Sequence, residues 1–169
     1  YRILAIGGRV ISVVKRLPAH VIGDGSSTIR NLILQENTRR EQNMLRHIPV
    51  DEETQHILQS SNLTLETVPN TGETIELRKN ANLTTGGTTE ECHDIVHPYY
   101  KEISIKALEA IDLEFGGIDL ITPDITQPVK CAINEINYNP GLRIHYKVTN
   151  GEPQKVAIQI LEYVRDQYM

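Results

Sequence analysis

The strands expected in this chain come in neighbouring pairs, which limits the folds that the chain can adopt. Two apolar, β-branched runs, 2–6 and 10–16, are separated only by Gly7-Gly8-Arg9. A Gly-Gly step between such runs predicts a tight hairpin, because the turn needs residues that accept positive φ. A second pair of runs, 117–122 and 130–138, occurs later in the chain. Neighbouring pairs of this kind favour an antiparallel sheet.

Helical patterns lie between and after these strands. A turn at 24–27 precedes a helix that Ser26 or Ser27 would cap. The polar stretch 36–42 is expected to be a fraying end or a surface loop. Further elements are expected as short strands at 63–68 and 74–77, a loop at 80–89, and helices that begin near Asp51, after Pro98 and at Val156. The sequence therefore predicts an α+β fold, with a mainly antiparallel sheet and helices packed on one face.

The composition excludes several classes of protein. Apolar residues make up 39% of the 169 residues, which is enough to bury a core. The 17 Lys and Arg residues are outnumbered by 22 Asp and Glu residues, so a nucleic-acid partner is not expected. The sequence contains no run of 18 apolar residues, so a membrane span is not expected. Cys92 and Cys131 fit neither a disulfide framework nor a metal knuckle, and we expect reduced thiols in the cytoplasm.

The segment from Gly116 to Gly141 carries the most informative polar residues. If its two strands pair as a hairpin centred on Gln127, Asp119 lies opposite Glu135. Side chains alternate along a strand, so one face would hold Cys131, Ile133, Glu135 and Asn137.

Opposed carboxylates repel each other unless a cation lies between them. Oxygen ligands without nearby Cys or His suit Mg²⁺, so Asp119, Glu135 and Asn137 form a candidate magnesium site. The alternative is a half-exposed sheet whose polar residues face solvent.

A second candidate segment runs from Arg78 to Gly87. Arg78 and Lys79 lead into a loop of amides, hydroxyls and glycines that can direct side chains and backbone N–H groups at an anion. The segment lacks the Lys-Ser/Thr step of a Walker loop, so it indicates phosphate contact only weakly. An ordinary polar loop is the alternative interpretation.

These segments resemble the ATP-grasp ligases. The pattern Glu135-Ile136-Asn137-x-x-Pro140-Gly141, preceded by Gly117-Ile118-Asp119, is similar to their metal-binding end, and 82–87 is similar to their phosphate-side loop. The segments 16–25, 77–83, 96–98 and 140–145 together resemble the ATP-grasp region of cyanophycin synthetases, with the bifunctional glutathione-forming ligases next. The Tyr138-Asn139 step departs from the small residues usual in cyanophycin synthetases, and the glutathione enzymes show an Asn there.

The resemblance implies a reaction and a set of site residues. ATP would phosphorylate a carboxylate to an acyl phosphate, and an amine would then attack it, giving an amide, ADP and phosphate. The implied residues are Asp119, Glu135 and Asn137 for Mg²⁺; Arg2 and Arg78 as catalytic residues; Arg78, Asn82, Thr84, Thr85, Gly86 and Gly87 for ATP phosphates; and Arg16, Arg143 and His145 for substrate. For Arg143 and His145 the alternative is simple surface polarity.

The resemblance also implies that the sequence is part of a longer protein. The chain starts at Tyr1 inside an expected strand, so we expect 1–169 to be the C-terminal lobe of a longer ATP-grasp enzyme without its N-terminal nucleotide clamp. Such a fragment would be inactive, while the whole protein would be a homo-oligomer that adds aspartate to an Arg-Asp polymer. Two alternatives remain open: a glutathione-synthetase-type ligase, and a non-catalytic module that senses nucleotide or serves assembly.

Overall fold

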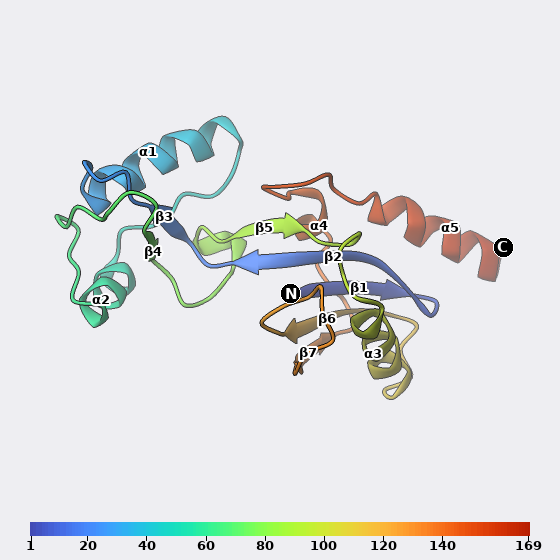
Figure 1. Ribbon diagram of the computed structural model, residues 1–169. Coiled ribbons are helices and arrows are strands. Elements are labelled where there is room, and N and C mark those ends of the chain that lie inside the picture. Colours follow the sequence, from blue (N-terminus) through green and yellow to red (C-terminus); the bar gives the residue numbers. More distant parts are fainter. The chain divides into compact units, whose positions relative to one another are not determined.

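The protein divides into two compact units, each with its own core. The computed structural model describes residues 1–169, and Figure 1 shows the elements in chain order. The sheet unit consists of Tyr1–Lys15 and Thr89–Met169, and the smaller unit of Arg16–Thr88. None of the helices has both the length and the apolar character needed to cross a bilayer.

The sheet unit is built around a five-stranded sheet in the order β5-β2-β1-β6-β7. β1 pairs antiparallel with β2 and with β6, and β6 pairs antiparallel with β7, so both expected hairpins are confirmed. The strands are β1 (Arg2–Ile6), β2 (Arg9–Leu17), β5 (Thr88–Glu91), β6 (Phe115–Ile121) and β7 (Ala132–Asn137). The helices of this unit are α3 (Pro98–Glu109), α4 (Arg143–Tyr146) and α5 (Val156–Tyr168).

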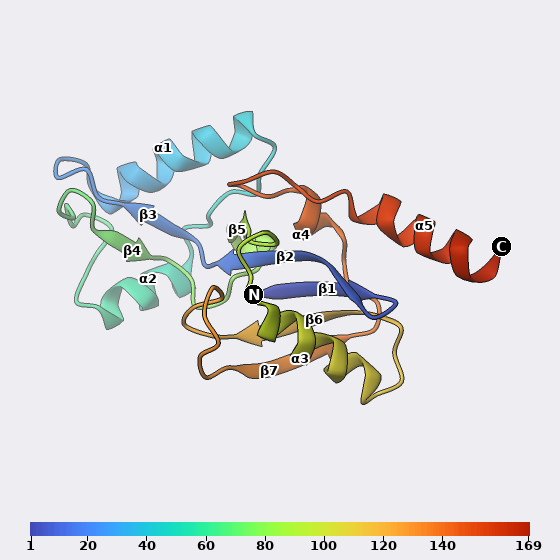
Figure 2. The same cartoon turned by 45° about the vertical axis from the view of Figure 1, so that its right-hand side comes forward.

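Helices cover both faces of this sheet. Ile3 and Ala5 of β1 belong to the cluster that contains α3 residues, whereas Leu4 and Ile6 belong to the cluster that α5 completes. Figure 2 shows α3 and α5 on opposite sides of β1. The α+β class and the antiparallel sheet agree with the sequence, but the expected single helical face does not hold for this unit. The continuous apolar run of β1, at most 3% exposed from Ile3 to Ile6, buries both of its faces.

The smaller unit packs two helices around a short two-stranded sheet. β3 (His20–Ile22) pairs with β4 (Thr74–Glu76), and Ile29, Leu32 and Ile33 of the first helix enter the same buried cluster as Val21 and Ile75. The other elements are α1 (Ile29–Gln42), α2 (Glu52–Ser60) and the 3₁₀ turn η1 (Leu83–Thr85).

The expected strand at 63–68 is wrong, and the structure gives the reason. The carbonyls of Leu65 and Thr67 accept hydrogen bonds from the N–H groups of Arg30 and Ile29, both 2.9 Å long. These N–H groups belong to the first turn of α1 and have no partner within the helix. The segment 63–68 therefore supplies hydrogen-bond acceptors to the start of α1. β4 pairs instead with 20–22, which the sequence did not indicate as a strand.

The boundaries of α1 also differ from the expectation. Thr28 caps the helix, while the N–H groups of Ser26 and Ser27 bond to the Asp24 carboxylate. The polar stretch expected to fray stays helical to Gln42, because Glu36 pairs with Arg39 and Arg40 one turn later.

Candidate functional site

The register between β6 and β7 brings the candidate metal ligands onto one face. Asp119 lies opposite Glu135, and Gly117 lies opposite Asn137, as the hairpin centred on Gln127 predicts. Directly opposed residues of an antiparallel pair project to the same side of the sheet. The Asp119 side chain is 14% exposed, Glu135 is exposed and Asn137 is half-buried. Two carboxylates and an amide therefore share one face at the edge of the sheet.

A bulge in β7 separates these residues from the rest of the strand. The register shifts between Asp119 and Leu120, so that Leu120 pairs with Ile133 and Asn134 is the extra residue. The expectation that Cys131 and Ile133 share the face of Glu135 is therefore wrong. Ile133 instead opposes the buried Leu120, and Cys131 packs against the core on the α3 side. The bulge therefore places Ile133, which is 39% exposed, on the face of Leu120, while the candidate oxygen ligands lie on the other face.

Arg2 is the resident counter-charge of Asp119. β1 places Arg2 directly opposite Asp119, and its guanidinium pairs with both carboxylate oxygens, Nε with Oδ1 and Nη2 with Oδ2 at 3.1 Å. Both side chains are less than 15% exposed, so solvent screens the pair only weakly. Gly117 makes room for it, since a Cβ there would lie 2.7 Å from Pro140 Cβ and 3.2 Å from Arg2 Cδ.

His145 lies inside the sheet unit. It is fully buried, and its Nδ1 is 2.7 Å from the hydroxyl of Ser12, which is also fully buried. Burial, followed by the positive charge of Arg2, lowers the pKa of His145 to about 4, so the ring is neutral at pH 7. Nε2 has no hydrogen-bond partner. His145 therefore anchors α4 to β2, whereas Arg143, at the start of α4, is exposed.

In the smaller unit, Arg78 is completely buried. Its Nη2 is 2.7 Å from Asp51 Oδ2, and Nη1 donates to the Leu77 carbonyl and to the Thr54 hydroxyl. The Thr54 amide, and after it the Arg78 guanidinium, lowers the pKa of Asp51. Asp51 is the N-cap of α2, so Arg78 ties the start of that helix to the strand β4 region. Nη1 and Nη2 of Arg78 therefore both bond to groups within the smaller unit.

The glycine-rich loop of the smaller unit is compact. Asn82 and Thr84 are exposed, and the Thr85 hydroxyl donates to Asn80 Oδ1 at 2.8 Å. Gly86 ends η1 with φ 88°, and a Cβ there would lie 2.9 Å from Ile48 Cγ1, so only glycine fits. The Gly87 N–H donates to the Asn82 carbonyl.

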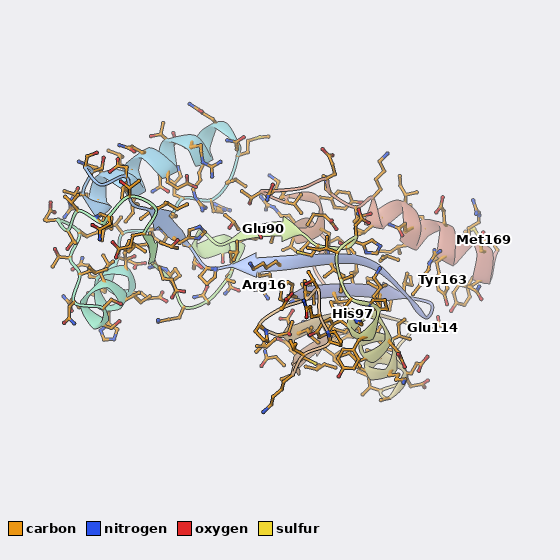
Figure 3. The ribbon with its side chains drawn as sticks, viewed as in Figure 1. Arg16, Glu90, His97, Glu114, Tyr163 and Met169 are labelled. Carbon is orange, nitrogen blue, oxygen red and sulfur yellow. The ribbon has the colours of Figure 1, made fainter.

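Arg16 reaches the same loop, because its Nη2 donates to Asn82 Oδ1 at 2.9 Å; Arg16 is labelled in Figure 3.

The structure thus gathers the candidate residues into two groups. One comprises Arg2, Asp119, Glu135 and Asn137 in the sheet unit; the other comprises Arg16, Asn82 and the loop to Gly87 in the smaller unit. Sequence reasoning did not identify the Ser12–His145 and Arg78–Asp51 pairs, because each joins segments far apart in the chain. The hard oxygen donors at Asp119, Glu135 and Asn137 fit Mg²⁺, and the exposure of Glu135 leaves room for the waters that this ion keeps.

Comparisons with known proteins show the family of the chain. A family model described as RimK-like ATP-grasp domain matches residues 19–164. Cyanophycin synthetase from Geminocystis herdmanii is 37% identical over 170 residues, which cover 96% of this chain and 20% of that protein. The glutathione biosynthesis bifunctional protein GshAB from Clostridium perfringens is 34% identical, with 96% of this chain and 22% of that protein covered.

A solved structure is similar over nearly the whole chain. The crystal structure of a bifunctional glutathione synthetase from Pasteurella multocida superposes with a TM-score of 0.82 and 26% identity, covering 98% of this chain and 24% of that one. The chain spans about a fifth of the length of the curated relatives it matches. Because the family model covers most of the chain and relatives above 30% identity align along it, this protein belongs to the RimK-like ATP-grasp family of ATP-using ligases.

Proposed function

We propose that this chain supplies the metal-binding part of an ATP-dependent carboxylate–amine ligase that forms an amide through an acyl phosphate. The observation that carries the proposal is the β6–β7 register, which sets Asp119 opposite Glu135 and Gly117 opposite Asn137. A bound Mg²⁺ would neutralise the charge of the transferring phosphoryl group. Family membership supplies the ATP-dependent reaction class, and the three oxygen ligands supply a place for the ion.

In the proposal, Arg2 holds the Asp119 side chain in position before a cation binds. Its bidentate pair with Asp119 orients that carboxylate within a weakly solvated part of the sheet. A cation that binds Asp119 would compete with Arg2 for the same oxygens. The guanidinium would then be available to a second anion, such as the carboxylate or acyl phosphate of the substrate, which is the role proposed for Arg2.

The loop of the smaller unit is proposed to contact the phosphates of ATP. Asn82 and Thr84 are exposed, Thr85 is half-buried, and Gly86 and Gly87 keep the backbone free of side chains. Arg16 orients the Asn82 side-chain amide through its hydrogen bond to Asn82 Oδ1. Because the Arg78 guanidinium is used by Asp51 and Thr54, its proposed contribution is to hold the shape of this unit.

For the substrate, we propose the cyanophycin-type reaction, in which aspartate is added to an Arg-Asp polymer. The segments 16–25 and 140–145 and the relatives named cyanophycin synthetase support this choice. The exposed Arg143 on α4 is the proposed contact to a substrate carboxylate. A glutathione-type ligase is the second candidate, favoured by Asn139 and by the GshAB relatives.

In the proposal, the chain is the C-terminal lobe of a longer cytoplasmic, homo-oligomeric enzyme, and the nucleotide clamp lies outside it. The chain by itself would then bind ATP weakly and catalyse no reaction. The relatives' greater length supports this view, since the chain spans only about a fifth of each.

The test uses the full-length parent with ATP and Mg²⁺. ADP release stimulated by aspartate with an Arg-Asp primer supports the cyanophycin-type reaction, and stimulation by cysteine or glycine supports the glutathione type. Asp119→Ala and Glu135→Ala should abolish amide formation, whereas Glu109→Gln, an exposed carboxylate on α3, should leave it unchanged. Normal turnover in either alanine variant would exclude the proposed metal role. ATP binding with no product from any amino acid would favour the non-catalytic module.

A further inference from the structure

A single buried phenol organises the connection between the two strands of the metal face. Tyr100 of α3 is fully buried, and its Oη contacts residues from the start, middle and end of segment 122–129. The contacts are Thr122 Oγ1 at 2.9 Å, the Asp124 carbonyl at 3.0 Å, the Gln127 carbonyl at 2.7 Å, and the Val129 N–H and carbonyl, each at 3.2 Å. All of these residues lie between the end of β6 and the start of β7.

The bonding capacity of a hydroxyl fixes which of these contacts matter most. A phenol donates one hydrogen bond and accepts two. The shortest contact assigns the donated proton to the Gln127 carbonyl, while the Val129 N–H and the Thr122 hydroxyl donate to the oxygen. One buried oxygen therefore bonds to groups at three places in the connection. The Val129 N–H also donates to the Gln127 carbonyl at 2.8 Å, and the Thr122 hydroxyl to the Asp124 carbonyl at 3.3 Å. Removing the phenol oxygen therefore removes the bonds that join the connection to α3 and leaves the bonds within the connection.

The connection is attached to α3 at further points. The Ile125 carbonyl accepts a hydrogen bond from the N–H of His97, which is the N-cap of α3 and is labelled in Figure 3. The Ile125 side chain is 2% exposed and lies in the same cluster as Tyr100. Asp124 accepts from both the N–H and the hydroxyl of Thr126. The first turn of α3 thus contacts the connection through His97 and Tyr100, and the Asp124–Thr126 bonds lie within the connection.

The position of this connection determines the register of β7. A slip of one residue moves every side chain of a strand to the opposite face. β7 already contains such a shift at Asn134, between the connection and the Asp119–Glu135 pair. The neighbouring edge of β7 has no strand beyond it to fix the register, since β7 is the last strand of the sheet. The connection and the β6 ladder are what hold Glu135 and Asn137 on their face.

We propose that Tyr100 is a positioning residue, which fixes the β7 register through its hydroxyl and so places Glu135 and Asn137 opposite Asp119 and Gly117. It does not contact the metal face itself, because Tyr100 lies in the core on the opposite side of the sheet. The proposal rests on the proposed function only where it concerns the metal ion.

The test compares the full chain with its Tyr100→Phe variant, which keeps the ring and the packing. Amide hydrogen exchange in 132–137 should become about tenfold faster, which is what loss of a hydrogen bond of ordinary strength gives. The Mn²⁺ concentration that half-broadens the amide signals of Glu135 and Asn137 should rise about tenfold, the lower end for groups that orient ligands. Thr122→Val should shift both quantities in the same direction.

Two control variants separate positioning from general stability. Tyr168→Phe removes another tyrosine hydroxyl, whose exposed hydrogen bond to Glu114 lies at the far end of α5, and should change neither quantity. Ile160→Ala loosens the cluster on the α5 side and should lower the melting temperature without shifting the Mn²⁺ midpoint. Unchanged exchange in 132–137 for Tyr100→Phe, or equal acceleration there in Ile160→Ala, would overturn the proposal. Absence of Mn²⁺ broadening in the unmodified chain would overturn the metal site, while the exchange comparison still decides the role of Tyr100.

Discussion

At the scale of single residues, the sheet unit holds a histidine that burial keeps neutral. His145 has a pKa of about 4 because of desolvation and the nearby Arg2 charge, whereas an unfolded histidine titrates near 6.5. The unfolded chain therefore binds more protons between these two values, so stability is intact above about pH 6.5 and falls as the pH drops toward 4. The full effect is about 3 kcal/mol. Urea unfolding at several pH values should show this loss, and His145→Gln should remove that part of the pH dependence; an unaltered profile would contradict it.

A substitution at Gly117 tests the packing around the Arg2–Asp119 pair. A Cβ at this position would overlap Pro140 and press on the Arg2 side chain, so Gly117→Ala should lower the free energy of unfolding by about 1–3 kcal/mol. Gly141→Ala is the matched control, since no atom lies within 4 Å of its added Cβ. Equal stability of the two variants in urea would show that the space at Gly117 is not needed.

At the scale of elements, the glycine-rich loop depends on both conformation and space. Gly86 and Gly72 both have φ above 80°, but only Gly86 also has a neighbour, Ile48, in the way of a Cβ. Gly72→Ala should cost about 1 kcal/mol for the backbone alone, and Gly86→Ala should cost more. Thermal unfolding compares the two, and a Gly72 variant less stable than the Gly86 variant would contradict this account of the loop.

The elements also show how far the sequence alone reaches. The hairpins around Gly7-Gly8 and Gln127, and the Asp119–Glu135 pairing, follow from local turn chemistry and strand alternation. The Arg2–Asp119 pairing and the β3–β4 pair join segments more than 50 residues apart, and no local pattern indicates them. The strand wrongly expected at 63–68 has apolar residues that serve the smaller unit's core from a loop.

At the scale of the whole molecule, the two units have separate cores. The clusters around α3 and α5 contain only residues of the sheet unit, and the cluster around α1 contains only residues of the smaller unit. Ile33→Ala removes a fully packed side chain of α1 and should destabilise the smaller unit by about 2–5 kcal/mol. Hydrogen exchange should then accelerate in 16–88. Equal acceleration across the sheet unit would show that the two cores unfold as one.

The central claim is that Asp119, Glu135 and Asn137 together hold a divalent cation. The most direct measurement is anomalous scattering from crystals of the protein grown with Mn²⁺ and a non-hydrolysable ATP analogue. We expect a manganese peak bonded to carboxylate oxygens of Asp119 and Glu135 and to the amide oxygen of Asn137. A nucleotide-bound manganese ion that contacts none of these three side chains would contradict the account.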